Sequence, residues 1–68
     1  MENRLREMRE DKGMTQEEVA VRVGVSRQTI ISLEKGRYNP SILLAYRLAR
    51  LFGSSIEELF LLDKKGAE

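Results

Sequence analysis

A short segment near the middle of the chain combines side chains that can read the bases of duplex DNA. The segment GVSRQTIISLEKGRYNP spans residues 24–40. Within it, an Arg can pair with two acceptors of guanine, a Gln can pair with adenine, and a Ser can donate or accept. An Ile among them offers only apolar contact, and the thymine methyl is the one apolar group of the major groove. We therefore predict base contacts by Arg27, Gln28, Ile31 and Ser32.

A helix through this segment has a core side and an outward side. At about 100° per residue, Ile30 and Leu33 lie roughly 60° apart and define the buried side. The opposite side carries the candidate base-reading residues. Arg27 and Gln28 come first, where a helix inserted into a major groove reaches the bases. Two alternatives stay open, since Arg27 can instead contact a phosphate and Ile31 can turn sideways into the domain or into a dimer contact.

Two further residues suit the phosphate backbone. Lys35 lies late in the predicted helix, where a side chain meets the backbone more readily than a base. Gln16 lies in the first turn of the preceding helix, where free backbone N–H groups favour anions. We expect both to contact phosphates, with the alternative that Gln16 is a solvent-facing residue of a helix start.

Glu34 falls between the buried and the outward side of the same helix. A bare carboxylate in that position is costly unless it is paired. Arg9 lies beside the apolar stripe of the first predicted helix. We hypothesise that Arg9 and Glu34 form an ion pair that orients the arginine and restrains the base-reading helix.

Five short helices must position these side chains. Thr15-Gln-Glu-Glu18 and Ser55-Ile-Glu-Glu58 are capping boxes that open helices. Only Gly24 and Val25 separate the second helix from Ser26, a good N-cap for the third, and so short a connection defines a helix-turn-helix. The predicted helices cover Asn3–Lys12, Thr15 to Gly24, Ser26–Lys35, Asn39 or Ser41 to Phe52, and Ser55 to Leu61 or Leu62.

The apolar residues of these helices predict a single core and a second surface. On the first three helices the core positions are Leu5, Met8, Val19, Ala20, Val23, Ile30 and Leu33. On the fourth helix the stripe is Ile42, Ala45, Leu48, Ala49 and Phe52. Four further leucines exceed what one small core needs, and exposed apolar clusters mark interfaces. We therefore predict a homodimer interface made by Leu44, Leu51, Leu61 and Leu62.

Length and composition exclude several classes of site. The chain has 68 residues with neither Cys nor His, which removes disulfides and Cys- or His-based metal sites and catalysis. The adjacent glutamates at residues 17–18 and 57–58 are explained by helix capping and the helix dipole. We expect no enzyme activity, no cofactor and no metal.

The distribution of charge and of apolar residues bears on partners. The net charge is only +1, but residues 22–37 hold four basic side chains against one acidic one. No apolar run approaches the roughly 18 residues that span a bilayer. We expect one domain over residues 1–68, with a core at about 4–62, a polar tail at 63–68, a cytoplasmic location at the nucleoid and no membrane contact.

The stretch MTQEEVAVRVGVSRQTIISLEKGRYNPSILLAYRLARLF resembles the phage-repressor type of helix-turn-helix, the group that contains Cro and lambda repressor. The resemblance covers about residues 4–62 and includes TQEEVA, GVSRQTI, LEKGRYNPS and LA..F. It implies an all-α, five-helix, lambda-repressor-like domain. It also implies groove-facing roles for Arg27, Gln28 and Ser32. The phosphate contacts that we expect with it are Gln16, Thr29, Lys35, Arg37, Tyr38 and Asn39.

The function expected from this resemblance is sequence-specific binding of double-stranded DNA. We expect a transcriptional regulator, most simply a repressor, that binds a palindromic operator as a homodimer through the major groove in a prokaryote or phage. Ile31 departs from the polar residues common at its position, so no operator sequence transfers. No second domain follows, so we expect no small-molecule effector. The alternative is a protein-interaction module, such as an antitoxin or a bridging factor, with the same fold.

Overall fold

The computed structural model describes residues 2–37 and 39–61, which form five α-helices and no strand. In chain order these are α1 (Leu5–Asp11), α2 (Gln16–Val23), α3 (Arg27–Glu34), α4 (Ile42–Leu51) and α5 (Ile56–Phe60). The prediction of an all-α, five-helix domain is confirmed. Within the described ranges, no helix has the length and apolar character needed to cross a membrane.

Side-chain caps start four of the five helices. Thr15 and Ser55 form the two predicted capping boxes, with Glu18 and Glu58 as their partners. Ser26 caps α3, and Ser41 rather than Asn39 caps α4. The helix starts of α2, α3 and α5 are therefore confirmed, because an N-cap hydroxyl satisfies a backbone N–H that has no partner inside the helix.

The turn between α2 and α3 depends on a left-handed residue. Gly24 has φ +79°, and the N–H groups of Gly24 and Val25 donate to the Ala20 carbonyl at 2.9 and 3.0 Å. Val25 is partly buried and packs against the core from this turn. Ala20 on α2 is buried, and α2 packs against α3. The helix-turn-helix is therefore built from α2, this turn and α3.

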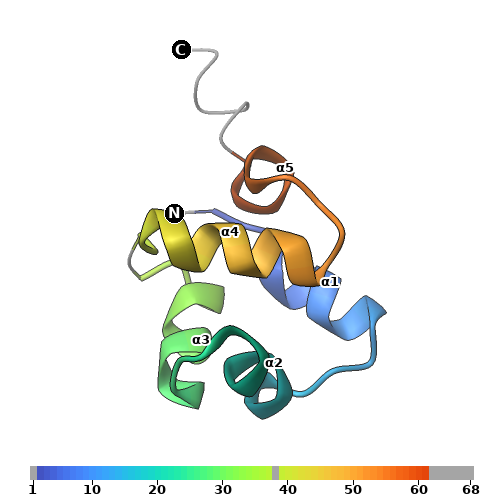
Figure 1. Cartoon of the computed structure of the whole chain (residues 1–68), viewed down its shortest axis with the longest axis vertical. Coiled ribbons are helices and arrows are strands. Elements are labelled where there is room, and N and C mark those ends of the chain that lie inside the picture. The colour runs from blue at the N-terminus through green and yellow to red at the C-terminus, as the bar shows by residue number, and fades with distance from the viewer. Residues whose placement is uncertain (1, 38, 62–68) are drawn as a thin grey trace.

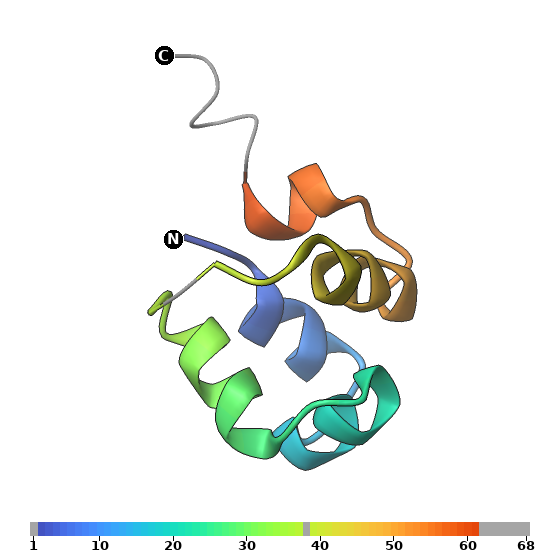
Figure 2. The ribbon, with the colours of Figure 1, turned by 60° about the vertical axis from the view of Figure 1, so that its left-hand side comes forward.

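The core lies between helices from all parts of the chain. The fully buried large side chains are Leu5, Val19, Ile30, Leu33, Leu48 and Leu59. In Figures 1 and 2, α2 and α3 lie together at one end of the molecule, and α5 lies at the other end beyond α4. The N–H of Arg4 donates to the carbonyl of Leu59 at 2.8 Å and joins the start of the chain to α5. This framework leaves one side of α3 uncovered.

Two predictions for α4 are wrong. Ile42 was expected in the core but is 85% exposed, whereas Leu44 was expected outside it but is 9% exposed and belongs to the core. The buried side of α4 is set by Ala45, Leu48 and Ala49. Leu44 lies one helical turn before Leu48 and shares its side, while Ile42 lies at the edge of the stripe at the first helical position. Leu44 is therefore unavailable as a surplus surface leucine.

Candidate nucleic-acid interface

The outward side of α3 begins with two exposed polar residues. Arg27 and Gln28 are exposed, directly after the N-cap Ser26. The Ser26 Oγ accepts a hydrogen bond from the Thr29 N–H at 3.2 Å. No acidic residue lies in the first turn of α3, so the positive end of its dipole is not offset by a side chain of the helix itself. This end of α3 presents an arginine, a glutamine and a positive dipole together.

Ile31 and Ser32 follow on the same side and are half-buried. Ile31 does not belong to the fully buried core. It lines an open hollow between the start of α2 and α3, together with Gln16, Glu34 and Lys35. Its side chain therefore lies between the predicted base-reading residues and the N-terminus of α2.

An ion pair joins α1 to the end of α3. Arg9 Nε donates to Glu34 Oε2 at 2.6 Å, and Arg9 Nη2 donates to Oε1 at 3.3 Å. Arg9 Nη1 also donates to the Met14 carbonyl at 2.9 Å. Both side chains are largely shielded from solvent, and the hydrogen bond to Glu34 raises the pKa of Arg9 further above its ordinary value. The pair hypothesised from the sequence is thus present and also holds the loop that precedes α2.

Gln16 joins this network from the first position of α2. Its Nε2 donates to Glu34 Oε1 at 3.1 Å. A side-chain amide nitrogen carries two hydrogens, so one remains for a second acceptor. Because Arg9 neutralises Glu34, an anion can approach that N–H without facing a bare carboxylate. Gln16 is therefore oriented by α3 before any ligand arrives.

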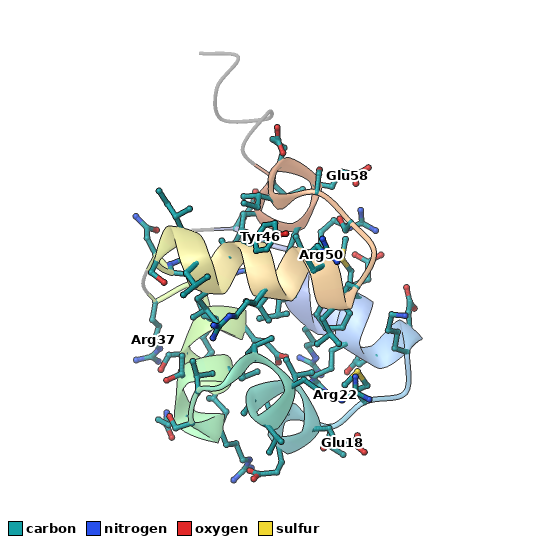
Figure 3. All side chains as sticks on the ribbon, in the orientation of Figure 1. Glu18, Arg22, Arg37, Tyr46, Arg50 and Glu58 are labelled. Carbon is teal, nitrogen blue, oxygen red and sulfur yellow. The ribbon has the colours of Figure 1, made fainter. Side chains whose placement is uncertain are left out.

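The remaining candidate phosphate contacts surround this side of α3. Lys35, Arg37 and Asn39 are exposed, whereas Tyr38 lies outside the described residues. Arg37 extends from the loop beyond α3 in Figure 3, and its backbone N–H donates to the Ser32 carbonyl at 3.1 Å. Thr29 is half-buried, and its hydroxyl lies 3.0 Å from that of Ser26. Of the five candidates among the described residues, Lys35, Arg37 and Asn39 therefore lie at or after the end of α3, and Gln16 and Thr29 lie near helix starts.

Asn3 was not predicted to have a role at this site. Its Nδ2 donates to the Leu33 carbonyl at 2.8 Å, and its Oδ1 accepts from the Leu5 N–H at 3.0 Å. Asn3 thereby joins the start of α1 to the last turn of α3. The contact with Leu5 is local, because an Asn side chain can accept from the backbone N–H two residues later. Its second partner, thirty residues later in the chain, has no local signal.

The predicted dimer residues have different surroundings. Leu51 is half-buried and packs against the core, and Leu61 is half-buried at the end of α5 with φ +56°. Leu62 lies outside the described residues. The large apolar side chains that α4 does expose are Ile42, Leu43 and Tyr46, and the sequence did not single them out as a surface.

Comparison with known proteins places this arrangement among regulators of transcription. The sequence matches the helix-turn-helix family HTH_3 over residues 5–59. It is 58% identical over 69 residues, covering all of both chains, to an uncharacterized HTH-type transcriptional regulator of Methanothermobacter thermautotrophicus. It is also 35% identical over 57 residues to the cryptic phage CTXphi transcriptional repressor RstR of Vibrio cholerae, covering 84% of this chain and 51% of that protein.

A solved structure extends the likeness to three dimensions. The restriction-modification controller protein C.AhdI of Aeromonas hydrophila superposes with a TM-score of 0.76 at 37% sequence identity. The alignment covers 84% of this chain and 86% of that one. The sequence comparison and the structural comparison therefore both match this chain to helix-turn-helix regulators.

Proposed function

The chain belongs to the HTH_3 helix-turn-helix family and is a DNA-binding regulator of transcription, and we propose that it represses by binding a palindromic operator as a homodimer. In this proposal α3 enters the major groove of double-stranded DNA. Two copies place their α3 helices about one DNA turn (~34 Å) apart, so that the symmetry of the operator matches that of the dimer.

The observation that carries this proposal is the outward side of α3. Arg27 and Gln28 are exposed at its capped N-terminus, which is the end of a recognition helix that reaches base edges. We assign base contacts to these two residues and to Ile31 and Ser32. Ile31 would meet a thymine methyl, because no other apolar group is offered by the major groove.

Phosphate contacts on either side of α3 would set its depth and register. Gln16, Thr29, Lys35, Arg37, Tyr38 and Asn39 fill this role in the proposal. Phosphate contacts position a protein on the duplex, while base contacts carry the sequence preference. The Arg9–Glu34 pair would act indirectly, since it fixes α3 relative to α1 and orients Gln16.

Repression follows from occlusion of a promoter by the bound dimer. The relative RstR is itself named a transcriptional repressor, which supports the same role here. A purified polymerase and a template with the operator overlapping the promoter would test this directly. We expect transcription to fall as the protein occupies the operator, whereas a rise would identify an activator.

Selection of binding sites from a random duplex library tests the specific binding. We expect enrichment of a palindrome whose half-sites are separated by about one helical turn. At one fixed salt concentration, the selected duplex should bind roughly 10³-fold or more tightly than a scrambled duplex. Equal affinity for the two would reject the proposal of a sequence-specific regulator.

A further inference from the structure

The start of the chain is joined to both α3 and α5. The half-buried Asn3 donates from Nδ2 to the Leu33 carbonyl at 2.8 Å, and the next residue, Arg4, donates its backbone N–H to the Leu59 carbonyl at 2.8 Å. Figure 2 shows this segment between α5 and the end of α3. The bond from Asn3 is therefore a tertiary contact with the helix that is proposed to enter the major groove.

The carbonyl that Asn3 contacts belongs to the turn that ends α3. The N–H of Gly36 donates to the same Leu33 oxygen at 2.9 Å, and the N–H of Arg37 donates to the Ser32 oxygen at 3.1 Å. Gly36 has φ +70°, in the left-handed region. These two bonds and this φ define a Schellman motif, a common way to end a helix. A carbonyl oxygen has two lone pairs, so the Leu33 oxygen accepts from Gly36 and from Asn3 at once.

This turn carries two of the proposed phosphate contacts. Lys35 is the C-cap of α3, and Arg37 is the residue whose N–H closes the Schellman motif. Both side chains are exposed. Arg9 also contacts this end of α3, but through the side chain of Glu34, whereas Asn3 contacts the backbone of the turn itself. The direction in which the two basic side chains leave the turn therefore depends on the bond from Asn3.

We propose that Asn3 is a positioning residue for DNA binding: its amide holds the turn that ends α3, so that Lys35 and Arg37 point at the DNA backbone. This inference rests on the phosphate contacts proposed for those two residues. Phosphate contacts position a protein on the duplex and carry no sequence information. Loss of the bond from Asn3 should therefore weaken binding to all duplexes by the same factor and leave the preference between them unchanged.

Asn3 also has a local role, and the two roles are separable by substitution. Its Oδ1 accepts from the Leu5 N–H at 3.0 Å, at the start of α1. A Ser hydroxyl accepts from the backbone in the same local way, but the side chain is too short to reach the Leu33 carbonyl as well. Asn3→Ser therefore keeps the local bond, removes the bond to α3 and leaves the charge of the protein unchanged.

Titration of the selected and the scrambled duplex at several salt concentrations measures the effect of Asn3→Ser. If one phosphate contact is lost, the slope of log K against log salt falls by about 0.9, which corresponds to about fivefold weaker binding at about 0.15 M salt. We expect this change for both duplexes, with the ratio of their affinities unchanged. Ser55→Ala is the matched control, because it removes the side-chain cap of α5, at the other end of the molecule from α3. It should lower the Tm without changing the slope.

Lys35→Ala and Arg37→Ala test the phosphate contacts by themselves. Each should lower the salt slope by about 0.9 in a protein that keeps Asn3. If neither does so, the proposed contacts and the inference that rests on them are both refuted. If either lowers the slope and Asn3→Ser does not, the contacts stand and Asn3 does not position them. A larger loss for Asn3→Ser on the selected duplex than on the scrambled one would also overturn the inference, because Asn3 would then act on the base-reading part of α3.

Amide hydrogen exchange measured by NMR gives a second readout that needs no DNA. The N–H groups of Gly36 and Arg37 should exchange about two- to tenfold faster in Asn3→Ser, because their turn has lost one hydrogen bond that holds it. The Gly24 N–H, which donates to the Ala20 carbonyl in the turn before α3, is the internal control and should keep its rate.

Asn3→Asp provides the same exchange measurement in a second variant, including the case in which Asn3→Ser does not fold. Its carboxylate keeps an acceptor for the Leu5 N–H and suits the start of a helix, but it has no hydrogen to donate to Leu33. We expect the same faster exchange at Gly36 and Arg37. Unchanged exchange at both amides in the folded variants would show that Asn3 does not hold this turn, and the inference would be rejected.

Discussion

The Arg9–Glu34 pair is shielded from solvent more than the other ion pairs among the described residues, Arg4–Glu7 and Arg6–Glu10. Removing one partner of a buried pair leaves the other charge desolvated and typically costs about 3–5 kcal/mol. We expect Arg9→Ala to cost more stability than Glu34→Ala, because it also removes the hydrogen bond to the Met14 carbonyl. The double variant should show a coupling of about 1–3 kcal/mol, as residues in one network do.

Urea unfolding of the four proteins of this cycle measures the coupling. A domain of this length is expected to have only about 3–10 kcal/mol of stability, so sulfate is included to keep the variants folded. Additive effects of Arg9→Ala and Glu34→Ala would mean that the contact contributes nothing beyond the two separate side chains.

Substitutions of Gln28 and Lys35 distinguish a base contact from a phosphate contact. Gln28→Ala should cost about 1–3 kcal/mol on the selected duplex and relax preference at one base position. Lys35→Ala should weaken selected and scrambled duplexes alike and reduce the slope of log K against log salt by about 0.9. Titrations of both duplexes at several salt concentrations give both quantities. If the slope of log K against log salt changes for Gln28→Ala and not for Lys35→Ala, then Gln28 contacts a phosphate and the assignment of the two residues is wrong.

At the scale of elements, the turn between α2 and α3 requires its glycine for backbone conformation and not for space. A Cβ added to Gly24 would meet only Arg47 Nη1, at an ordinary contact distance of 3.5 Å. Its φ of +79° nevertheless costs an L side chain about 1–2 kcal/mol. Gly24→Ala should destabilise by that amount in thermal unfolding. Gly24→Asn is the matched control and should cost less, because Asn tolerates the left-handed region.

The start of α5 predicts a dependence of stability on acidity. Hydrogen bonds from the Ser55 N–H and from the hydroxyls of Ser54 and Ser55 lower the pKa of Glu58 below its ordinary value of 4.5. A carboxylate with a lowered pKa in the folded state stabilises the fold fully above its unfolded pKa. That contribution disappears as the pH falls through the folded pKa.

Glu58→Gln tests this contribution, since Gln also fits the third position of a capping box. We expect the stability difference between the original protein and the variant to be constant near neutral pH and to shrink on acidification below about pH 4.5. Urea midpoints measured from pH 3 to pH 7 follow it. A difference that does not vary with pH would show that Glu58 caps α5 equally well when protonated.

The helices were predictable where their signals are local. Each cap is encoded within four consecutive residues, and each starts a helix: the capping boxes of Thr15 and Ser55 and the cap of Ser26. Ile42 and Leu44 could not be sorted the same way, because both lie near the edges of the apolar stripe of α4. Contact with neighbouring helices decides which is covered. Asn3 shows the same limit, since its partner Leu33 is defined only by the packed fold.

At the scale of the whole molecule, the candidate site was partly predictable for a physical reason. Arg27 and Gln28 are exposed because the core residues Ile30 and Leu33 fix the rotation of α3, and periodicity reveals that rotation. The hydrogen bond from Gln16 to Glu34 was not predicted, since it needs the crossing of α2 over α3. The exposure of Ile42 was not predicted either, because the packing of neighbouring helices decides which side of α4 is covered. Long-range geometry is therefore what the sequence pattern left open.

The small size of the domain couples its stability to its ligand. A chain of 68 residues buries about 60% of the surface exposed on unfolding and has little stability to spare. A ligand that binds only the folded state adds about 2.7 kcal/mol at one hundred times its dissociation constant. For a domain of this length each kcal/mol raises the Tm by roughly 4–8 °C. The selected duplex should therefore raise the Tm by roughly 10–20 °C under those conditions.

Scanning calorimetry with the selected and the scrambled duplex at equal concentration and at about 0.2 M salt measures this effect. We expect a much smaller shift with the scrambled duplex, because non-specific binding is weak at that salt concentration. Gln28→Ala should reduce the shift with the selected duplex and leave the Tm of the free protein nearly unchanged, because its side chain is exposed. Equal shifts with both duplexes would mean that backbone contacts alone hold the protein on DNA, and that α3 reads no sequence.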